Sequence, residues 1–378
     1  MPRKFSAKIL GNYYFRIRIG GIKLKSIILC AGKGTRLRPL THTSAKHLIP
    51  IANKPVLFYA IEAIKDCGVT DIGVIVGETA EDIKRELEDG DKWGVSISYI
   101  EQKEALGLAH AVLVAQDFLG EDKFLMYLGD NLLKNGVENY ARKFVEGNYN
   151  AFVLLTEVGD PRQFGVAELE KGRVVRVVEK PKEPVSNLAL IGVYFFDKNI
   201  HQAIKNIKPS ARGELEITDA IQWMINQGYK VGAEVIEGWW KDTGKPNDIL
   251  EANRLILEDI ERDISEAKVD EKSEILGRVK IGQGTEIINS KILGPVIIGK
   301  GARVVDSYVG PFTSLSDRAE IKKSEIECSV VLEESKLENI KGRMQRCLIG
   351  RGVEIYHSKD LPRVFQFTLG DHSKVGLL

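Results

Sequence analysis

The sequence has few cysteines, no long apolar run and no excess of charge of either sign. Its four cysteines, Cys30, Cys67, Cys328 and Cys347, lie far apart without a C-x-x-C pair, which excludes a disulfide scaffold and a cysteine zinc site and favours a reducing cytoplasm. No apolar run is long enough to span a bilayer. Lys and Arg number 54 against 53 Asp and Glu, so we expect neither nucleic acid nor a membrane among the partners.

The chain length and its first residues indicate how the sequence is divided. A chain of 378 residues is long enough for two or three domains. Residues 1–23 carry only basic charged side chains and lack the continuous apolar core of a secretion signal. We interpret them as an N-terminal appendage, either a mobile tail or an overlong gene start, with a basic binding arm as the alternative.

Residues 24–265 alternate apolar strands with helical segments. The strand-like segments include SIILC, DIGVIV, KFLMYL and AFVLLT, and the helical ones include KPVLFYAIEAIKDCG and GLAHAVLVAQDF. This alternation predicts an α/β domain with a doubly wound, mostly parallel sheet. A hairpin over residues 164–181, turning at Lys171-Gly172, interrupts the alternation, and a helix from about Pro246 to Ile264 ends the domain.

From about residue 271 the sequence repeats. Apolar residues recur every five or six positions, and motifs such as Ile281-Gly-Gln-Gly return at intervals of 17. The aliphatic residues expected to point inward are Ile275, Ile281, Ile287, Ile292, Ile298, Val304, Val309, Leu315, Ile321, Ile326 and Leu332. The pattern predicts a three-sided parallel β-helix of about five coils over residues 271–356, followed by a tail over residues 357–378. Such solenoids more often support an enzyme or its assembly than carry the reaction.

Two features are expected at one edge of the sheet. The glycines Gly32 and Gly34, followed by Arg36, come directly after SIILC and indicate a phosphate-binding loop. The order of residues fits neither the P-loop motif nor the Rossmann glycines, and a plain strand-to-helix turn with solvated basic side chains is the alternative. Asp130 follows KFLMYL. Because ligands bind where the strands of such a sheet end, we expect the loop and Asp130 to lie together.

Seven motifs together resemble a known family. They are LCAGKGTRLRPLT, SAKHLIPIANKP, LGDN, FGVAE, VEKP, ARGELEITDA and WWKDTG. Over residues 24–378 the chain resembles the sugar-1-phosphate nucleotidylyltransferases, specifically the long-form glucose-1-phosphate thymidylyltransferases. The resemblance implies a nucleotide-diphospho-sugar transferase-like Rossmann variant followed by a left-handed β-helix. It also implies a cytoplasmic, Mg²⁺-dependent enzyme that condenses dTTP with glucose-1-phosphate to give dTDP-glucose and pyrophosphate, assembled through the β-helix as a trimer or a multiple of it.

The resemblance also assigns roles to individual residues. The nucleotide would be bound by Gly32, Gly34, Thr35, Arg36, Gln102, Gly107 and Asp130, with Lys46 as a second cation on the phosphates and Asp130 and Asp242 as ligands of Mg²⁺. The sugar phosphate would be bound by Gly165, Glu179, Lys180, Arg212, Glu214 and Trp240. Without the resemblance, Lys46 would be taken for a surface lysine, the two aspartates for caps of turns or helices, and Gly107 for a helix start.

Two departures and three alternatives accompany this interpretation. His47 stands where short-form relatives commonly have Gln, and Phe164 where they have Tyr, so contacts to sugar or base are expected to differ. UTP is an alternative substrate, because one methyl group separates uracil from thymine and a pocket discriminates that difference weakly. A second activity, the transfer of an acetyl group by the β-helix, is disfavoured. Related acetyltransferases rely on a histidine base, and there is no histidine between Glu271 and Val353. A non-catalytic regulator is disfavoured because Arg36, Lys46, Asp130 and Asp242 are all present.

Overall fold

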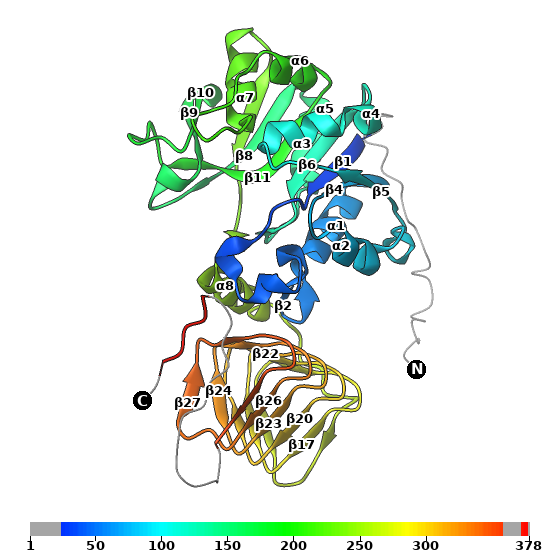
Figure 1. The fold of residues 1–378 in the computed structure, drawn as a ribbon, viewed down its shortest axis with the longest axis vertical. Helices are drawn as coiled ribbons and strands as arrows, with labels where there is room; N and C mark the ends of the chain where they lie inside the picture. Colours follow the sequence, from blue (N-terminus) through cyan, green and yellow to red (C-terminus); the bar gives the residue numbers. More distant parts are fainter. Residues whose placement is uncertain (1–23, 358–371, 377–378) are drawn as a thin grey trace, which may run out of the picture.

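The computed structural model describes residues 24–357 and 372–376. The predicted extension over residues 1–23 and most of the predicted tail lie outside this range. A sheet domain and a β-helix follow one another along the chain, with helix α8 between them (Figure 1). No helix in the described part of the chain is both long and apolar enough to cross a membrane.

The sheet of the first domain is mixed. Its nine strands include the path β10-β9-β11-β6-β1-β4-β5, with β8 paired to β11 and β12 paired to β8. The strands are β1 Leu24–Leu29, β4 Asp71–Val76, β5 Ser96–Glu101, β6 Lys123–Leu128, β8 Ala151–Glu157, β9 Gly165–Glu170, β10 Arg173–Glu179, β11 Leu188–Phe196 and β12 Val231–Val235. β6, β1, β4 and β5 are parallel, as predicted. β11 is antiparallel to both β6 and β8. The pairing with β8 is antiparallel because the hairpin β9–β10 connects β8 to β11, whereas a parallel return would need a crossover helix.

Helices cover both faces of this sheet, so the predicted doubly wound α/β fold is confirmed. They are α1 Val56–Asp66, α2 Ala80–Leu87, α3 Leu108–Val114, α4 Gln116–Leu119, α5 Glu138–Glu146, α6 Asn199–Lys205, α7 Ile217–Asn226 and α8 Pro246–Leu257. Helices α1, α2 and α5 share one buried core with strand residues such as Ile28. Helices α3, α6 and α7 share another core with residues such as Ile27. Successive strand residues point to opposite faces, which is why each strand serves both cores.

The last helix of the domain is shorter than the sequence pattern suggests. α8 ends at Leu257 rather than near Ile264. Beyond it, Asp263 forms a parallel bridge with Lys280, and Ile264 packs against the core of the β-helix. The apolar side chain that suggested a longer helix is therefore partly buried by the following domain.

The second domain is a three-sided β-helix, as predicted. The first sheet contains β14 Lys268–Val269, β17 Glu286–Ile288, β20 Arg303–Val305, β23 Glu320–Lys322, β26 Lys336–Glu338 and β29 Glu354–Tyr356. The second contains β15 Glu274–Leu276, β18 Lys291–Leu293, β21 Tyr308–Val309, β24 Glu325–Glu327 and β27 Arg343–Gln345. The third contains β16 Val279–Ile281, β19 Val296–Ile298, β22 Thr313–Leu315, β25 Val330–Val331 and β28 Leu348–Ile349. All three are parallel throughout (Figure 1), which is the arrangement of a left-handed β-helix.

One inward position differs from the prediction. The register pairs Leu315 with Val331 and Val331 with Ile349. Val331 is fully buried, whereas Leu332 is only half-buried. The strict interval of 17 therefore fails at this coil. The sequence could not show this shift, because two adjacent aliphatic residues, Val331 and Leu332, both fit the one inward position.

Hydrogen bonds join the β-helix to the sheet domain through two asparagines. Asn253 of α8 is fully buried. Its Oδ1 accepts hydrogen bonds from Ala52 N at 2.9 Å and Ser314 Oγ at 2.7 Å, and its Nδ2 donates to Phe312 O at 3.1 Å. Asn53 Nδ2 donates to Leu315 O at 2.7 Å. Ala52 and Asn53 form the turn between β2 (Pro50–Ile51) and β3 (Lys54–Pro55). We call this set of contacts the polar seam.

Candidate active site

The parallel strands β1, β4, β5 and β6 end at one edge of the sheet, and residues from distant motifs meet there. Cys30 N donates to Ile75 O at 2.8 Å, and Gln102 N donates to Val76 O at 2.8 Å. These bonds keep the segments that leave β1, β4 and β5 side by side. The loop after β1, Gln102 after β5 and Asp130 after β6 therefore share one rim.

The glycine loop after β1 makes room for Lys46. A Cβ atom on Gly32 would lie 3.2 Å from Lys46 Cε, and one on Gly34 would lie 2.9 Å from Lys46 Cβ. Gly34 also has a φ of 65°, which favours glycine. Thr35 and Arg36 follow and are exposed. The loop and Lys46 are thus brought together, in the arrangement expected of a phosphate site.

A short antiparallel ribbon places Asp242 beside Asp130. Strand β13 (Trp240–Asp242) pairs with β7 (Asn131–Leu133), and Asp242 lies opposite Asn131. Thr243 donates both its N–H, at 3.0 Å, and its hydroxyl, at 2.8 Å, to Asp130 O. Two carboxylates that are more than a hundred residues apart in sequence therefore become neighbours.

The two cations lie at these two carboxylates. Lys46 Nζ forms a hydrogen-bonded ion pair with Asp130 Oδ2. A Cβ atom on Gly244 would lie 2.8 Å from Arg36 Nη2 and 3.2 Å from Asp242 Oδ1, so the Arg36 guanidinium lies at the turn that follows Asp242. Arg36, Lys46, Asp130 and Asp242 thus occupy one small region of the rim.

Electrostatic interactions give the two carboxylates different acidities. Burial opposes ionisation of Asp130, but the Lys46 ammonium next to it holds the pKa of Asp130 below its ordinary range. Burial and the charge of Asp130 both raise the pKa of Asp242. Burial opposes charge on Lys46 as well, yet its contact with Asp130 raises the pKa of Lys46. Lys46 is therefore charged at neutral pH, and a second cation at Asp242 would relieve the repulsion between the carboxylates.

Asn131 is a site residue that the sequence motif contained but that the sequence interpretation left without a role. It is 2 % exposed, and its Nδ2 donates to Asp130 Oδ1 at 3.0 Å. Its Oδ1 accepts from Gly192 N at 3.2 Å and from Trp240 Nε1 at 2.6 Å. The amide therefore orients Asp130 and anchors β13. Its place directly after Asp130 in LGDN was the available signal.

Two uncharged side chains, His47 and Cys30, lie next to the charged residues Lys46 and Asp130. His47 is 1 % exposed, and burial together with the neighbouring Lys46 lowers its pKa to about 3. Burial, reinforced by the charge of Asp130, raises the pKa of the Cys30 thiol. Both side chains are therefore uncharged at neutral pH, which keeps Asp130 and Lys46 paired with each other.

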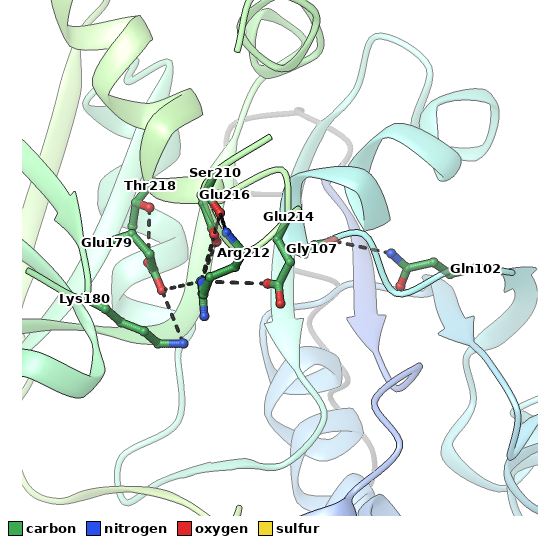
Figure 2. A network of polar contacts seen from close by, with 9 residues as sticks. All are labelled: Gln102, Gly107, Glu179, Lys180, Ser210, Arg212, Glu214, Glu216 and Thr218. Carbon is green, nitrogen blue, oxygen red and sulfur yellow. Dashed lines mark hydrogen bonds and ion pairs between the residues drawn. The ribbon is translucent and has the colours of Figure 1, made fainter. Parts of the chain in front are cut away.

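The residues predicted to bind the sugar phosphate form a second cluster (Figure 2). Arg212 Nη2 donates to both oxygens of Glu216 at 2.8 Å and to Glu179 Oε1 at 3.1 Å. Lys180 Nζ lies 3.7 Å from Glu179 Oε1, and Glu214 Oε2 lies 3.8 Å from Arg212 Nη2. Burial raises the pKa of Glu179, despite the opposing charges of Lys180 and Arg212. All four predicted charged residues are brought together.

Glu216 was not predicted, and it is the anchor of this cluster. Its side chain is 5 % exposed, and it accepts a hydrogen bond from Ser210 Oγ at 2.7 Å in addition to those from Arg212. The alternation of Arg212, Glu214 and Glu216 in ARGELE was the only sequence signal. Arg212 Nε also donates to Glu216 Oε1 at 3.2 Å, so Nε and Nη2 together hold the guanidinium in a planar, two-point contact with the carboxylate.

Aromatic residues connect the two clusters. The rings of Phe164 and Trp240 meet edge to face, with centroids 5.6 Å apart. Trp240 belongs to the same strand as Asp242, and Phe164 O accepts from Lys180 N at 3.0 Å. A Cβ atom on the next residue, Gly165, would lie 2.7 Å from Thr218 Cγ2 and 3.2 Å from Glu179 Oε2. Trp240 and Gly165 thus lie where the two clusters adjoin.

The residues predicted to contact the base lie beside the second cluster. Leu215 N donates to Leu106 O at 2.7 Å, and Ala109 N donates to Leu215 O at 3.1 Å. A Cβ atom on Gly107, whose φ is 103°, would lie 2.5 Å from Leu215 O. Glycine is therefore required here by the neighbouring backbone, whether or not a base also contacts it. Figure 2 shows Gly107 near Glu214, with Gln102 on the far side.

The site offers charge and metal ligands. Within residues 24–357 and 372–376, no group of three or more His, Cys, Asp and Glu side chains is arranged as a metal site. Two adjacent carboxylates, one with a raised pKa, fit Mg²⁺, which keeps several waters and binds through one or two carboxylates plus phosphate oxygens. The arrangement can neutralise a polyphosphate.

Comparison with known proteins identifies the family of the chain. Residues 25–259 match the family described as nucleotidyl transferase. The chain is 53% identical to a glucose-1-phosphate thymidylyltransferase of Streptomyces antibioticus over 354 residues, which cover 93% of this chain and 99% of the relative. It is 50% identical to a glucose-1-phosphate thymidylyltransferase of Streptomyces griseus, with the same coverage. A solved Bacillus anthracis protein, provisionally identified as a glucose-1-phosphate thymidylyltransferase and crystallised with sucrose, is similar at a TM-score of 0.59 and 38% identity, covering 64% of this chain and 97% of its own. The chain belongs to the nucleotidyl transferase family.

Proposed function

We propose that this protein joins dTTP to glucose-1-phosphate and releases pyrophosphate, forming dTDP-glucose. The observation that supports this most is the meeting of Arg36, Lys46, Asp130 and Asp242 at the rim, beside the cluster built on Arg212. The relatives named glucose-1-phosphate thymidylyltransferase match over nearly the whole chain. UTP is the alternative nucleotide, since one methyl group distinguishes the two bases.

The reaction requires charge neutralisation and alignment. A sugar phosphate oxygen attacks the α-phosphorus of the nucleotide, and the bond from that phosphorus to the pyrophosphate oxygen breaks. The attacking phosphate is largely ionised at neutral pH, so the chain does not have to remove a proton. Arg36 and Lys46 would hold the triphosphate, and Lys180 and Arg212 would hold the sugar phosphate. These contacts lower the barrier by aligning two anions that otherwise repel each other.

A divalent metal is part of this proposal. Asp130 and Asp242 would hold Mg²⁺, which supplies charge neutralisation at the phosphates when it is bound. Asp130 also keeps Lys46 charged and in place. The Glu179 carboxylate lies next to both Lys180 and Arg212. It would therefore accept hydrogen bonds from hydroxyl groups of the sugar whose phosphate these two residues hold.

A matrix of nucleotides against sugar-1-phosphates tests the function and its metal dependence. We expect the fastest pyrophosphate release with dTTP or UTP together with glucose-1-phosphate and Mg²⁺. Excess EDTA should abolish release, and added Mg²⁺ should restore it. If the folded protein released no pyrophosphate with any pair, the alternative of a non-catalytic regulator would be favoured.

Glu216→Gln tests the second cluster. Removing the negative charge weakens the two-point contact that holds Arg212, and contacts of this kind contribute about 1.5–3 kcal/mol. We expect the KM for glucose-1-phosphate to rise at least about tenfold, with the KM for dTTP nearly unchanged. Asp219→Asn, which removes a carboxylate from α7, the helix that begins at Ile217, is the control. An equal rise in both KM values would show that Glu216 supports the whole fold rather than Arg212.

Assembly and cellular location complete the proposal. We propose a homo-oligomer, a trimer or a multiple of it, formed through the β-helix. We also place the protein in the cytoplasm, where a reducing environment suits four cysteines that are all free thiols.

A further inference from the structure

The amide of Gln102 is held in one place by its surroundings. Gln102 is 7 % exposed, and its backbone N–H donates a hydrogen bond to Val76 O. Gln102 Nε2 lies 3.3 Å from Gly107 O and 3.0 Å from His110 Nδ1. His110 lies in α3, one turn after Gly107, and no sequence motif assigned it a role.

Only one orientation of this amide satisfies both neighbours. Gly107 O is a carbonyl oxygen that also accepts from Ala111 N at 3.3 Å, so the Gln102 atom that faces it must be the NH₂ group. With NH₂ in that position, His110 Nδ1 must accept the second hydrogen bond. The proton of the neutral imidazole is then on Nε2.

The same orientation presents the carbonyl oxygen of Gln102 to the site. Among the described residues, none donates a hydrogen bond to Gln102 Oε1. The fully buried polar atoms that lack a hydrogen-bond partner in this part of the chain do not include Oε1. Oε1 is therefore not enclosed by the protein. Figure 2 shows the Gln102 oxygen pointing away from Gly107. An acceptor without a protein donor is thus available for a ligand.

We propose that His110 is a positioning residue for base selection: it holds the Gln102 amide so that Oε1 accepts the N3–H of a thymine or uracil base. This inference rests on the proposed function and extends it to the choice among pyrimidine nucleotides. Cytosine has a lone pair at N3, so its N3 would face Oε1 acceptor to acceptor. A site that hydrogen-bonds a donor rejects a ligand that lacks it, because a buried polar group is left unpaired.

Two variants of nearly equal shape separate the hydrogen bond from packing. His110→Asn retains an oxygen acceptor near the position of Nδ1, whereas His110→Leu places a methyl group there. Binding of dTTP and dCTP with Mg²⁺, measured by calorimetry without sugar phosphate, reads base selection independently of catalysis. We expect the wild type and His110→Asn to prefer dTTP about 100-fold or more. In His110→Leu the preference should fall about tenfold, the loss of one such hydrogen bond.

Each outcome of this experiment either supports or contradicts the proposed role of His110. A dTTP preference that is unchanged in His110→Leu, or reduced equally in both variants, would overturn the role of His110, and so would a wild type that binds the two nucleotides equally. Selective binding that behaves as expected, in a wild type that releases no pyrophosphate, would overturn the proposed reaction while supporting this inference.

Discussion

Asp242→Asn is expected to lower kcat for pyrophosphate release about 10³-fold. The substitution keeps the shape of the side chain but removes one of the two carboxylates that the β7–β13 ribbon brings together. Loss of a single group that stabilises transition-state charge typically costs about 10²–10³ in kcat, and a metal ligand is expected to lie at the upper end of that range. Initial rates at saturating dTTP, glucose-1-phosphate and Mg²⁺ are the measurement.

The same variant should be at least as stable as the wild type in the absence of metal. The pKa of Asp242 is raised by burial and by Asp130, so the folded state favours the protonated form. Its contribution to stability is present below the ordinary carboxyl range, near pH 4, and is lost as the pH rises through the raised pKa. Asparagine mimics the protonated form. The difference in Tm between the variant and the wild type, measured in EDTA, should therefore be small at pH 4 and favour the variant at pH 8.

Two controls complete this test. Asp259→Asn removes a carboxylate that pairs with Lys134 on the surface, and it should leave both kcat and Tm nearly unchanged. If Asp242→Asn retained more than a tenth of wild-type kcat, Asp242 would not be a metal ligand. If it lost activity and Tm together, misfolding would explain the loss.

Asn253→Leu is expected to destabilise the protein by about 3–5 kcal/mol. The two side chains are similar in volume, so the change leaves no large cavity. It does leave Ala52 N, the Ser314 hydroxyl and Phe312 O without the partners that they have in the polar seam, and each buried unpaired group costs about 1–3 kcal/mol. Chemical denaturation, followed by tryptophan fluorescence, measures the free energy of unfolding of the sheet domain, where all four tryptophans lie.

The position of Asn253 also predicts how unfolding changes. Because the seam joins α8 and the β2–β3 turn to β22, weakening it should uncouple the sheet domain from the β-helix. We expect calorimetry to show one transition in the wild type and two in the variant. Asn247→Leu makes the same substitution on an exposed position of α8 and should cost less than about 1 kcal/mol. Equal effects of the two substitutions would mean that the seam does not stabilise the protein.

Part of the site could be predicted from local sequence alone. The glycine loop and Asp130 each follow an apolar strand directly, and the ends of neighbouring parallel strands meet at one edge. Asp242 had no such signal, because β13 belongs to a separate two-stranded ribbon. Its place beside Asp130 comes from pairing with β7, a contact between segments more than a hundred residues apart. Only the family resemblance predicted that Asp242 belonged to the site.

The positioning residues were missed for a related reason. Asn131, Glu216 and His110 act through hydrogen bonds to side chains that are one, four and eight residues away in the sequence, and a single sequence does not show which of its nearby side chains turn toward one another. In the β-helix the same limit appears as a choice between Val331 and Leu332. Both are apolar, and only the pairing of β25 with β22 and β28 decided which one is buried.

By itself the sequence determined the elements of this protein: strands and helices alternating over the first domain, short strands of nearly constant spacing over the second, and a glycine loop rich in cations. These depend on periodic burial and on backbone preferences that act over a few residues. The tertiary structure decided which distant side chains meet, namely Lys46 with Asp130, Asp242 with Asp130, Arg212 with Glu179 and Asn253 with the β-helix. Such pairs form only when strand order and domain packing bring separate segments within hydrogen-bonding distance, and no local pattern encodes that distance.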